Sequence, residues 1–134
     1  RLSLYQRLNN TEDDEELKAI YNELQDRFGH IPSQVDDLFE TVRCRKLAIE
    51  LGFEKMSLKN NMLRCHFINR PDSPYFESDI FQKIIEYLQT QTNKARLKQT
   101  GKLFLLIAEP IPSMKSLYEF LEDLHKYCFA TSLA

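Results

Sequence analysis

The first third of the chain places its apolar residues at helical spacing. Three of them between positions 2 and 8 predict a short first helix. A second helix is expected from Thr11, whose hydroxyl is a good N-cap, to Gly29, which favours a helix end. The apolar stripe of this second helix consists of Leu17, Ile20, Tyr21, Leu24 and Phe28.

A third helix is predicted after the turn at Pro32. Ser33 is its expected N-cap, and Gly52 is its expected C-terminal stop. The residues expected on its core face are Val35, Leu38, Phe39, Val42 and Ile49. The sequence therefore predicts three consecutive helices before any strand.

Beyond Gly52 the hydrophobic period changes to two. Residues 63–67 alternate apolar with polar side chains, and Asn60-Asn61 favours a two-residue turn between them and residues 56–58. Residues 95–99 and 102–108 form a similar pair around a central glycine, and the second of these is apolar enough for a central strand. We expect two β-hairpins.

Two further helices are predicted, one after each hairpin. Ser78 is the expected N-cap of the first, and Ser113 is that of the second. Their apolar stripes are Ile80, Phe81, Ile84, Ile85 and Leu88, then Leu117, Phe120, Leu121, Leu124 and Cys128. The order ααα-ββ-α-ββ-α predicts an α+β fold, in which a small mixed or antiparallel sheet packs against helices.

The chain is expected to form a single domain over residues 1–134. This length is close to the commonest domain size, and no internal stretch is long enough to serve as a linker. The first residues lack an initiator Met and read as the middle of an element, so we expect a fragment of a larger multidomain protein.

Composition places the chain among ordinary globular proteins. It is 43% apolar and 28% charged, with a net charge of −2 that gives no general attraction to nucleic acid or to anionic membranes. No apolar run approaches the length of a membrane span. Cys44, Cys65 and Cys128 are odd in number and widely spaced, which is not a secreted disulfide pattern. We expect a soluble protein in a reducing cytoplasm.

The sequence offers little support for catalysis. The glycines stand alone, so a phosphate-binding loop is not expected, and no serine lies in a Gly-x-Ser-x-Gly elbow. Cys65 and His66 would point to opposite faces of a strand, which disfavours a shared metal ion. His30 is expected to have a local structural role and His125 to lie on the surface. We predict no catalytic, cofactor or metal site in this domain.

An acidic face is the most informative feature of the second helix. Helical spacing gathers Glu12, Glu16, Glu23 and Asp26 away from the apolar stripe. Only Lys18 opposes the seven acidic residues between positions 12 and 26, so we expect most of these carboxylates to be available to a partner. The alternative is a solvated face whose charges offset the helix dipole.

Basic residues concentrate elsewhere and leave a second function open. They are Arg43, Arg45, Lys46, Lys55, Lys59, Lys94, Arg96, Lys98 and Lys102. A nucleic-acid-binding module that uses the basic hairpins is the alternative function. Alternation places Arg96 and Lys98 together on one sheet face, but no aromatic platform interleaves with them, and lysines that protect sheet edges are a simpler explanation.

Three sequence blocks resemble the last domain of the transcription-repair coupling factor family, often called Mfd. Residues 23–32, ELQDRFGHIP, resemble the family signature E-L-x-D-R-F-G-x-x-P. Residues 4–8, LYQRL, resemble its L-Y-x-R-[IL], and residues 51–53, LGF, resemble its L-G-[IFV]. These blocks cover about the first half of the chain, whereas the second half matches only in the order of its elements.

The resemblance implies a regulatory domain of a larger DNA-repair machine. In that family the ATP-dependent DNA translocase modules, which use ATP and Mg, and the module that binds RNA polymerase lie upstream of this domain. The domain docks on the N-terminal module that binds UvrA and masks it until a stalled polymerase is engaged. The partners implied for the whole protein are thus RNA polymerase, UvrA and double-stranded DNA, with none in a membrane.

The resemblance also implies which residues make the docking contact. Acidic residues of the signature helix contact the N-terminal module, and the matching positions here are Glu23 and Asp26. We expect charge-assisted hydrogen bonds from arginines of that module. Arg27 is expected to orient the pair or to reach a partner carboxylate, with an intrahelical ion pair as the alternative.

Overall fold

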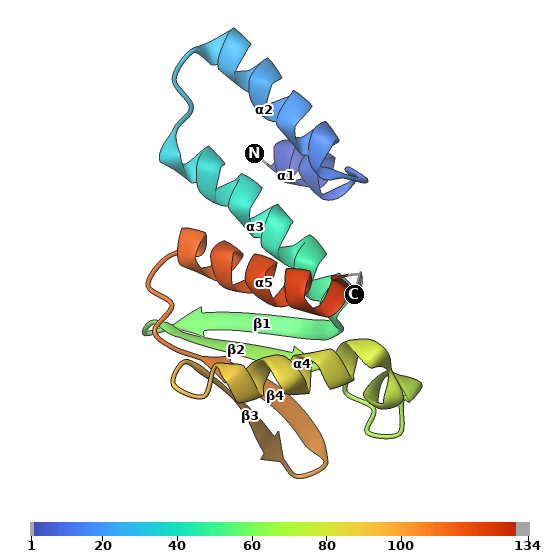
Figure 1. Cartoon of the computed structure of the whole chain (residues 1–134). Coiled ribbons are helices and arrows are strands. Elements are labelled where there is room, and N and C mark those ends of the chain that lie inside the picture. Colours follow the sequence, from blue (N-terminus) through green and yellow to red (C-terminus); the bar gives the residue numbers. More distant parts are fainter. Residues whose placement is uncertain (1, 131–134) are drawn as a thin grey trace. The chain divides into compact units, whose positions relative to one another are not determined.

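The predicted order of helices and strands is confirmed in the computed structural model, which describes residues 2–130 (Figure 1). Five α-helices and four strands follow one another as expected, and a short 3₁₀ helix that the sequence did not predict precedes the fourth α-helix. The elements are α1 Leu2–Asn9, α2 Asp14–Phe28, α3 Ser33–Leu51, β1 Phe53–Lys59, β2 Met62–Phe67, η1 Pro74–Glu77, α4 Asp79–Thr90, β3 Ala95–Thr100, β4 Leu103–Ala108 and α5 Met114–Phe129. None of the described helices is both long and apolar enough to cross a bilayer.

The residues group into two compact units. Unit 1 comprises residues 1–45 and unit 2 comprises residues 46–134, so the boundary falls within α3. Unit 1 has six basic and ten acidic residues, whereas unit 2 has twelve basic and ten acidic residues. The small net charge of the chain therefore combines an acidic unit with a mildly basic one.

Unit 1 is built on a small apolar core supplied by its three helices. Leu8 of α1, Leu17 and Ile20 of α2, and Phe39 and Val42 of α3 are buried together. The ring of Tyr21 meets that of Phe39 edge-on, with 5.1 Å between their centroids. This core orients α2 so that its acidic side faces solvent.

The buried side of α3 changes along the helix. Phe39 and Val42 are buried on the predicted face, but Cys44, Ala48 and Leu51, which are buried further along, lie on the opposite side. Ile49 was predicted to lie in the core and is 62% exposed instead. That prediction was wrong because it extended a single apolar stripe through the whole helix.

Unit 2 contains a four-stranded antiparallel sheet in the order β1-β2-β4-β3. Asn60 and Asn61, with φ angles of 51° and 63°, form the predicted tight turn between β1 and β2. The apolar strand β4 is interior, as expected, and joins the two hairpins by pairing with β2.

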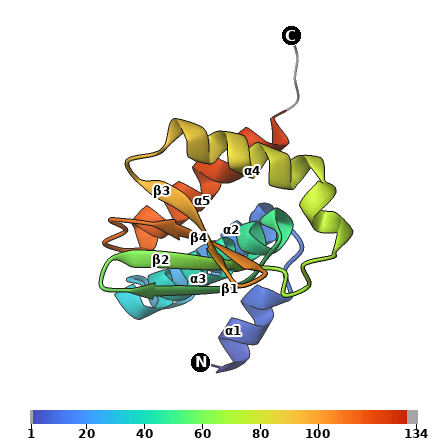
Figure 2. The same cartoon turned by 90° about the horizontal axis from the view of Figure 1, so that it is seen from below.

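Helices α4 and α5 both lie on one side of this sheet (Figure 2). Their N-caps are Ser78 and Ser113, as predicted, and each serine hydroxyl accepts a hydrogen bond from a backbone N–H of the first turn. The ring of Phe81 in α4 packs against Phe67 of β2 at 5.4 Å and against Phe104 of β4 at 6.3 Å. All five residues predicted for the apolar stripe of α5 are buried.

Candidate docking surface on the second helix

The start of α2 is closed by its own carboxylates. Asp13 is the N-cap, and its Oδ1 accepts a hydrogen bond of 3.0 Å from the backbone N–H of Glu16. Glu16 in turn accepts one of 3.2 Å from the backbone N–H of Glu12, which gives an arrangement close to a capping box. Thr11, the predicted N-cap, is buried and donates its hydroxyl to the carbonyl of Leu8 at 2.6 Å. That prediction was wrong because the helix starts later and the hydroxyl closes the end of α1.

Basic residues within unit 1 neutralise part of the remaining acidic face. Asp14 lies 3.6 Å from the amine of Lys18 and 3.2 Å from Nε of Arg43 in α3. Arg43 had been considered as part of a nucleic-acid surface, but it also pairs with Glu40. Four of the seven acidic residues thus have an intramolecular role, namely Asp13, Asp14, Glu16 and Glu23.

Glu23 forms an ion pair that the sequence did not predict. Its Oε2 lies 2.7 Å from Nη1 of Arg7 in α1, and about half of each side chain is exposed. The hydrogen bond and the charge of Arg7 lower the pKa of Glu23 below 4.5, and Arg27 lowers it further. The sequence signal for this contact was Arg7 within the LYQRL block, since a short turn folds α1 back on α2.

Asp26 is the freer of the two predicted docking carboxylates. It is exposed, and no hydrogen bond or ion pair joins it to another residue of the described chain. Arg27 places its guanidinium 5.3 Å from the centre of the Phe28 ring, a cation–π contact, while its charge acts on Glu23 one turn earlier. The three predicted residues therefore lie within one turn of α2 and present both signs of charge.

Phe28 does not complete the core as predicted. Its side chain is 65% exposed because α2 ends immediately after it, where the backbone N–H of Gly29 bonds to the carbonyl of Gln25. It borders a shallow apolar hollow of about 330 Å³. The residues lining this hollow are Leu4, Leu24, Phe28, His30, Ile31, Pro32 and Val35. The exposed ring of Phe28 thus borders this apolar hollow and contacts Arg27, whereas Asp26 lies towards the acidic face of the helix.

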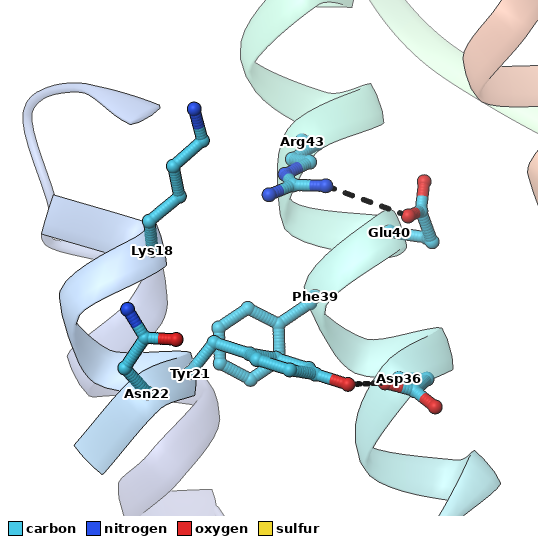
Figure 3. Close-up of a pocket in the computed structure, with 7 residues that line it drawn as sticks. All are labelled: Lys18, Tyr21, Asn22, Asp36, Phe39, Glu40 and Arg43. Atoms are coloured by element: carbon cyan, nitrogen blue, oxygen red, sulfur yellow. Dashed lines mark hydrogen bonds and ion pairs between the residues drawn. The ribbon is translucent and has the colours of Figure 1, made fainter. Parts of the chain in front are cut away.

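A second hollow, of about 360 Å³, lies between α2 and α3 within unit 1 (Figure 3). Tyr21 points across it and donates its hydroxyl to Asp36 at 2.8 Å, and this hydrogen bond raises the pKa of Tyr21. Arg43 and Glu40 pair on the same wall. The Tyr21–Asp36 hydrogen bond joins α2 to α3, and Lys18, which also lines the hollow, pairs with Asp14.

The cysteines and His125, which are the side chains with potential for chemistry, are buried or packed against neighbouring residues. Burial raises the pKa of the Cys44 thiol to about 12 and that of Cys128 to about 11, so neither is a ready nucleophile. His125 is half-buried rather than fully on the surface, with its Nε2 2.6 Å from Glu50 and its ring stacked on Phe129. Within residues 2–130, no three His, Cys, Asp or Glu side chains cluster in a way that would hold a metal ion.

Comparison with known proteins identifies the domain that contains this surface. A family model described as the TRCF domain matches residues 1–78, which is more than half of the chain. The chain belongs to the TRCF domain family. The matched region contains the whole acidic helix and, in the structure, continues to the N-cap of α4.

Relatives of this TRCF domain are far longer than the chain. The transcription-repair-coupling factor of Rickettsia bellii is 29% identical over 106 residues, which are 79% of this chain and 9% of that protein. The transcription-repair-coupling factor of Borreliella burgdorferi is 31% identical over 93 residues, or 69% of this chain and 8% of that protein. The chain therefore spans about a tenth of the relatives that it matches.

The fold of the TRCF domain is also found in a solved structure. The crystal structure of the C-terminal domain of a transcription-repair coupling factor superposes with a TM-score of 0.72 at 20% identity, covering 94% of this chain and 79% of that one. The part of the chain after residue 78, where the family match ends, therefore shares this fold as well.

Proposed function

We propose that this chain is a non-catalytic regulatory domain of a transcription-repair coupling factor. In this proposal the whole protein is an ATP-dependent DNA translocase that removes stalled RNA polymerase and recruits nucleotide excision repair, with ATP and Mg bound in an upstream motor. The end of α2 docks on the N-terminal UvrA-binding module of the same protein and keeps it masked. Membership of the TRCF domain family supports this assignment.

The main support for this docking site is that the carboxylate of Asp26 is exposed and unpaired among the described residues. The carboxylates of Glu12 and Glu15 are also exposed and unpaired there, whereas the other four acidic residues at positions 12–26 are engaged. Of the three unpaired residues, only Asp26 belongs to the segment ELQDRFGHIP that resembles the family signature. A carboxylate that the domain does not use is free to accept charge-assisted hydrogen bonds from an arginine of a partner.

Glu23 is a second binding site for the partner, and Arg7 of the same domain competes for it. An arginine of the partner has to share Glu23 with Arg7 or displace Arg7 from it. Because ion pairs between half-exposed side chains contribute little to stability, the competition from Arg7 is modest. It lowers the docking affinity slightly, which is the direction that a reversible latch requires.

The apolar hollow beside Phe28 supplies the non-polar part of the docking surface. Stable interfaces surround a few apolar or aromatic anchors with a polar rim. Phe28 and the hollow provide such an anchor, and Arg27, whose guanidinium contacts the Phe28 ring, provides a charge next to it. This assigns Phe28 a role in binding.

Titration of this domain against the isolated N-terminal module, followed by calorimetry, tests the proposal. The Glu23→Gln/Asp26→Asn variant is expected to bind at least about tenfold more weakly, because hydrogen bonds to charged groups are stronger than those between neutral groups. The wild-type affinity should fall as salt is added. Arg7→Ala is expected to bind more tightly, since it releases Glu23 from its internal partner.

A matched control removes two charges from unit 1 outside the proposed contact. Glu12→Gln/Asp37→Asn changes two exposed carboxylates, one before α2 and one in α3, and should leave the affinity almost unchanged. Equal binding by wild type and Glu23→Gln/Asp26→Asn would refute this docking surface. Equal weakening in both double variants would reduce the effect to net charge and would refute it too.

A further inference from the structure

The two faces of the sheet in unit 2 have opposite characters. One face carries Leu63 and Cys65 of β2 and Leu106 and Ala108 of β4, each 0% exposed. Helices α4 and α5 both lie on that side, and neither view places a helix of unit 2 over the other face (Figures 1 and 2). The second face carries the alternate residues of each strand, and the basic side chains at its edges are exposed.

This second face carries five lysine and arginine side chains, and we call it the basic face. They are Lys55, Lys59, Arg64, Arg96 and Lys98. The strand registers bring them together: Ser57, Arg64, Ile107 and Arg96 form one row across the four strands, and Lys55, His66, Leu105 and Lys98 form the next.

The positive charges of the basic face are almost unopposed. No acidic residue belongs to the two rows, and Glu54, in the irregular part of β1, accepts a hydrogen bond from the backbone N–H of Asn69. Glu109, directly after β4, lies 3.9 Å from Arg96. The other four basic side chains have no hydrogen bond or ion pair with any described residue. The face therefore carries an excess of positive charge, with four of its five basic side chains exposed and Arg64 half-buried.

Protection of the sheet edges explains only part of this pattern. Lysines on edge strands discourage pairing with another chain, which accounts for the residues on β1 and β3. Arg64 lies on the interior strand β2, where there is no edge to protect. Its charge is better explained by a ligand of the face itself.

The chemistry of the basic face favours a phosphate backbone over a protein. Leu105 and Ile107, in the middle of the face, are 8% and 3% exposed, so its centre has no exposed apolar anchor. Lysine is depleted at protein interfaces but is a common ligand of phosphate groups. The rows of this face also contain no aromatic side chain on which an unpaired base would stack, other than the imidazole of His66.

We propose that the basic face binds the backbone of double-stranded nucleic acid without regard to sequence. The contacts are ion pairs from lysine and arginine to phosphate oxygens, which orient the duplex along the sheet. Such binding is weak alone, with dissociation constants of about 10⁻⁴–10⁻⁶ M, and depends strongly on salt. It uses residues of unit 2 and does not require the docking of α2.

Fluorescence anisotropy with the whole 134-residue chain and a labelled random-sequence DNA duplex tests the proposal. Wild type is expected to bind at about 50 mM salt, and Arg64→Gln/Lys98→Gln should bind on the order of tenfold more weakly. The slope of log affinity against log salt should fall by about 2, because two ion pairs to phosphate are removed.

The control is Lys115→Gln/Lys126→Gln, which removes two exposed charges from α5. It should keep the wild-type affinity and salt slope. Absence of duplex binding at low salt, or an equal weakening in both double variants, would overturn the proposal. So would tighter binding to single-stranded DNA, to polyglutamate or to phosphatidylserine vesicles, each of which would assign the face to another ligand. Circular dichroism confirms that the variants fold.

Discussion

Glu23 and Asp26 are three residues apart on α2 but have different surroundings. Glu23 forms an ion pair with Arg7, whereas Asp26 is exposed and has no partner among the described residues. Their position on one helix follows from the local sequence, and this part of the site was predictable. The Arg7 contact depends on how α1 folds back on α2, which is a tertiary property that helical spacing does not contain. The carboxylate of Glu23, which the sequence suggests is unpaired, is therefore engaged by Arg7 in the folded domain.

The pKa of Glu23 is expected to report this contact. In the wild type it should lie below 4.5, and Arg7→Ala should raise it towards that value, because the largest causes of the shift are removed. A depressed pKa stabilises the fold above the unfolded value, and this contribution disappears as the pH falls through the folded value. NMR titration of the Glu23 carboxyl measures the change directly.

Arg27→Ala serves as the comparison for that titration. Among the groups that lower the pKa of Glu23, Arg27 has the smallest effect, so its removal should raise the value less than Arg7→Ala does. A pKa for Glu23 that is the same in wild type and Arg7→Ala would show that the ion pair does not form in solution.

Helices and strands followed the sequence where their signals are local. The caps at Ser78 and Ser113 and the Asn60-Asn61 turn each depend on a few neighbouring residues, and all three were predicted. The predictions for Thr11 and Ile49 were wrong because the surroundings of these side chains depend on residues outside the local pattern. Thr11 closes α1, and Ile49 lies on a helix whose buried side changes along its length.

The junction between α3 and β1 gives a test at the level of the element. Gly52 has a φ angle of +97°, and a Cβ atom there would overlap the ring of Tyr75, whose hydroxyl donates to the Leu51 carbonyl at 2.6 Å. Gly52→Ala is expected to lower the free energy of unfolding by about 2–5 kcal/mol, from backbone strain together with overpacking. Chemical denaturation measures the difference.

Gly101→Ala is the matched control for this substitution. Gly101 also has a positive φ, of +64°, but nothing lies within 4 Å of a Cβ atom placed there. Its cost should be about 1–2 kcal/mol, from backbone strain alone. If Gly52→Ala were no more destabilising than Gly101→Ala, the close packing of Tyr75 on Gly52 would be contradicted.

At the scale of the whole molecule, charge is divided along the chain. The net charge of −2 conceals an acidic unit 1 and a basic unit 2. Composition alone therefore argued against binding to anions, and the individual basic residues were seen in the sequence. Their assembly into one face was not predictable, because it requires the strand order β1-β2-β4-β3. In this order Arg64 of β2 lies between β1 and β4.

The cysteines test whether the described fold is maintained throughout the molecule. Cys44, Cys65 and Cys128 are all buried without disulfides, and they come from α3, β2 and α5. Burial also keeps Cys44 and Cys128 protonated near neutral pH, with pKa values of about 12 and 11. All three are expected to resist iodoacetamide in the native protein and to react readily in denaturant, as followed by mass spectrometry. Rapid alkylation of any one under native conditions would contradict its burial.

The contact of Tyr75 with Gly52 also has an evolutionary consequence. The two residues are 23 positions apart in the chain, yet the ring occupies the space that any larger residue at position 52 would need. Substitution at one position is therefore conditional on the other. Among homologous domains, sequences with a side chain in place of this glycine should also replace the tyrosine with a smaller residue, so that the two sites covary as a pair.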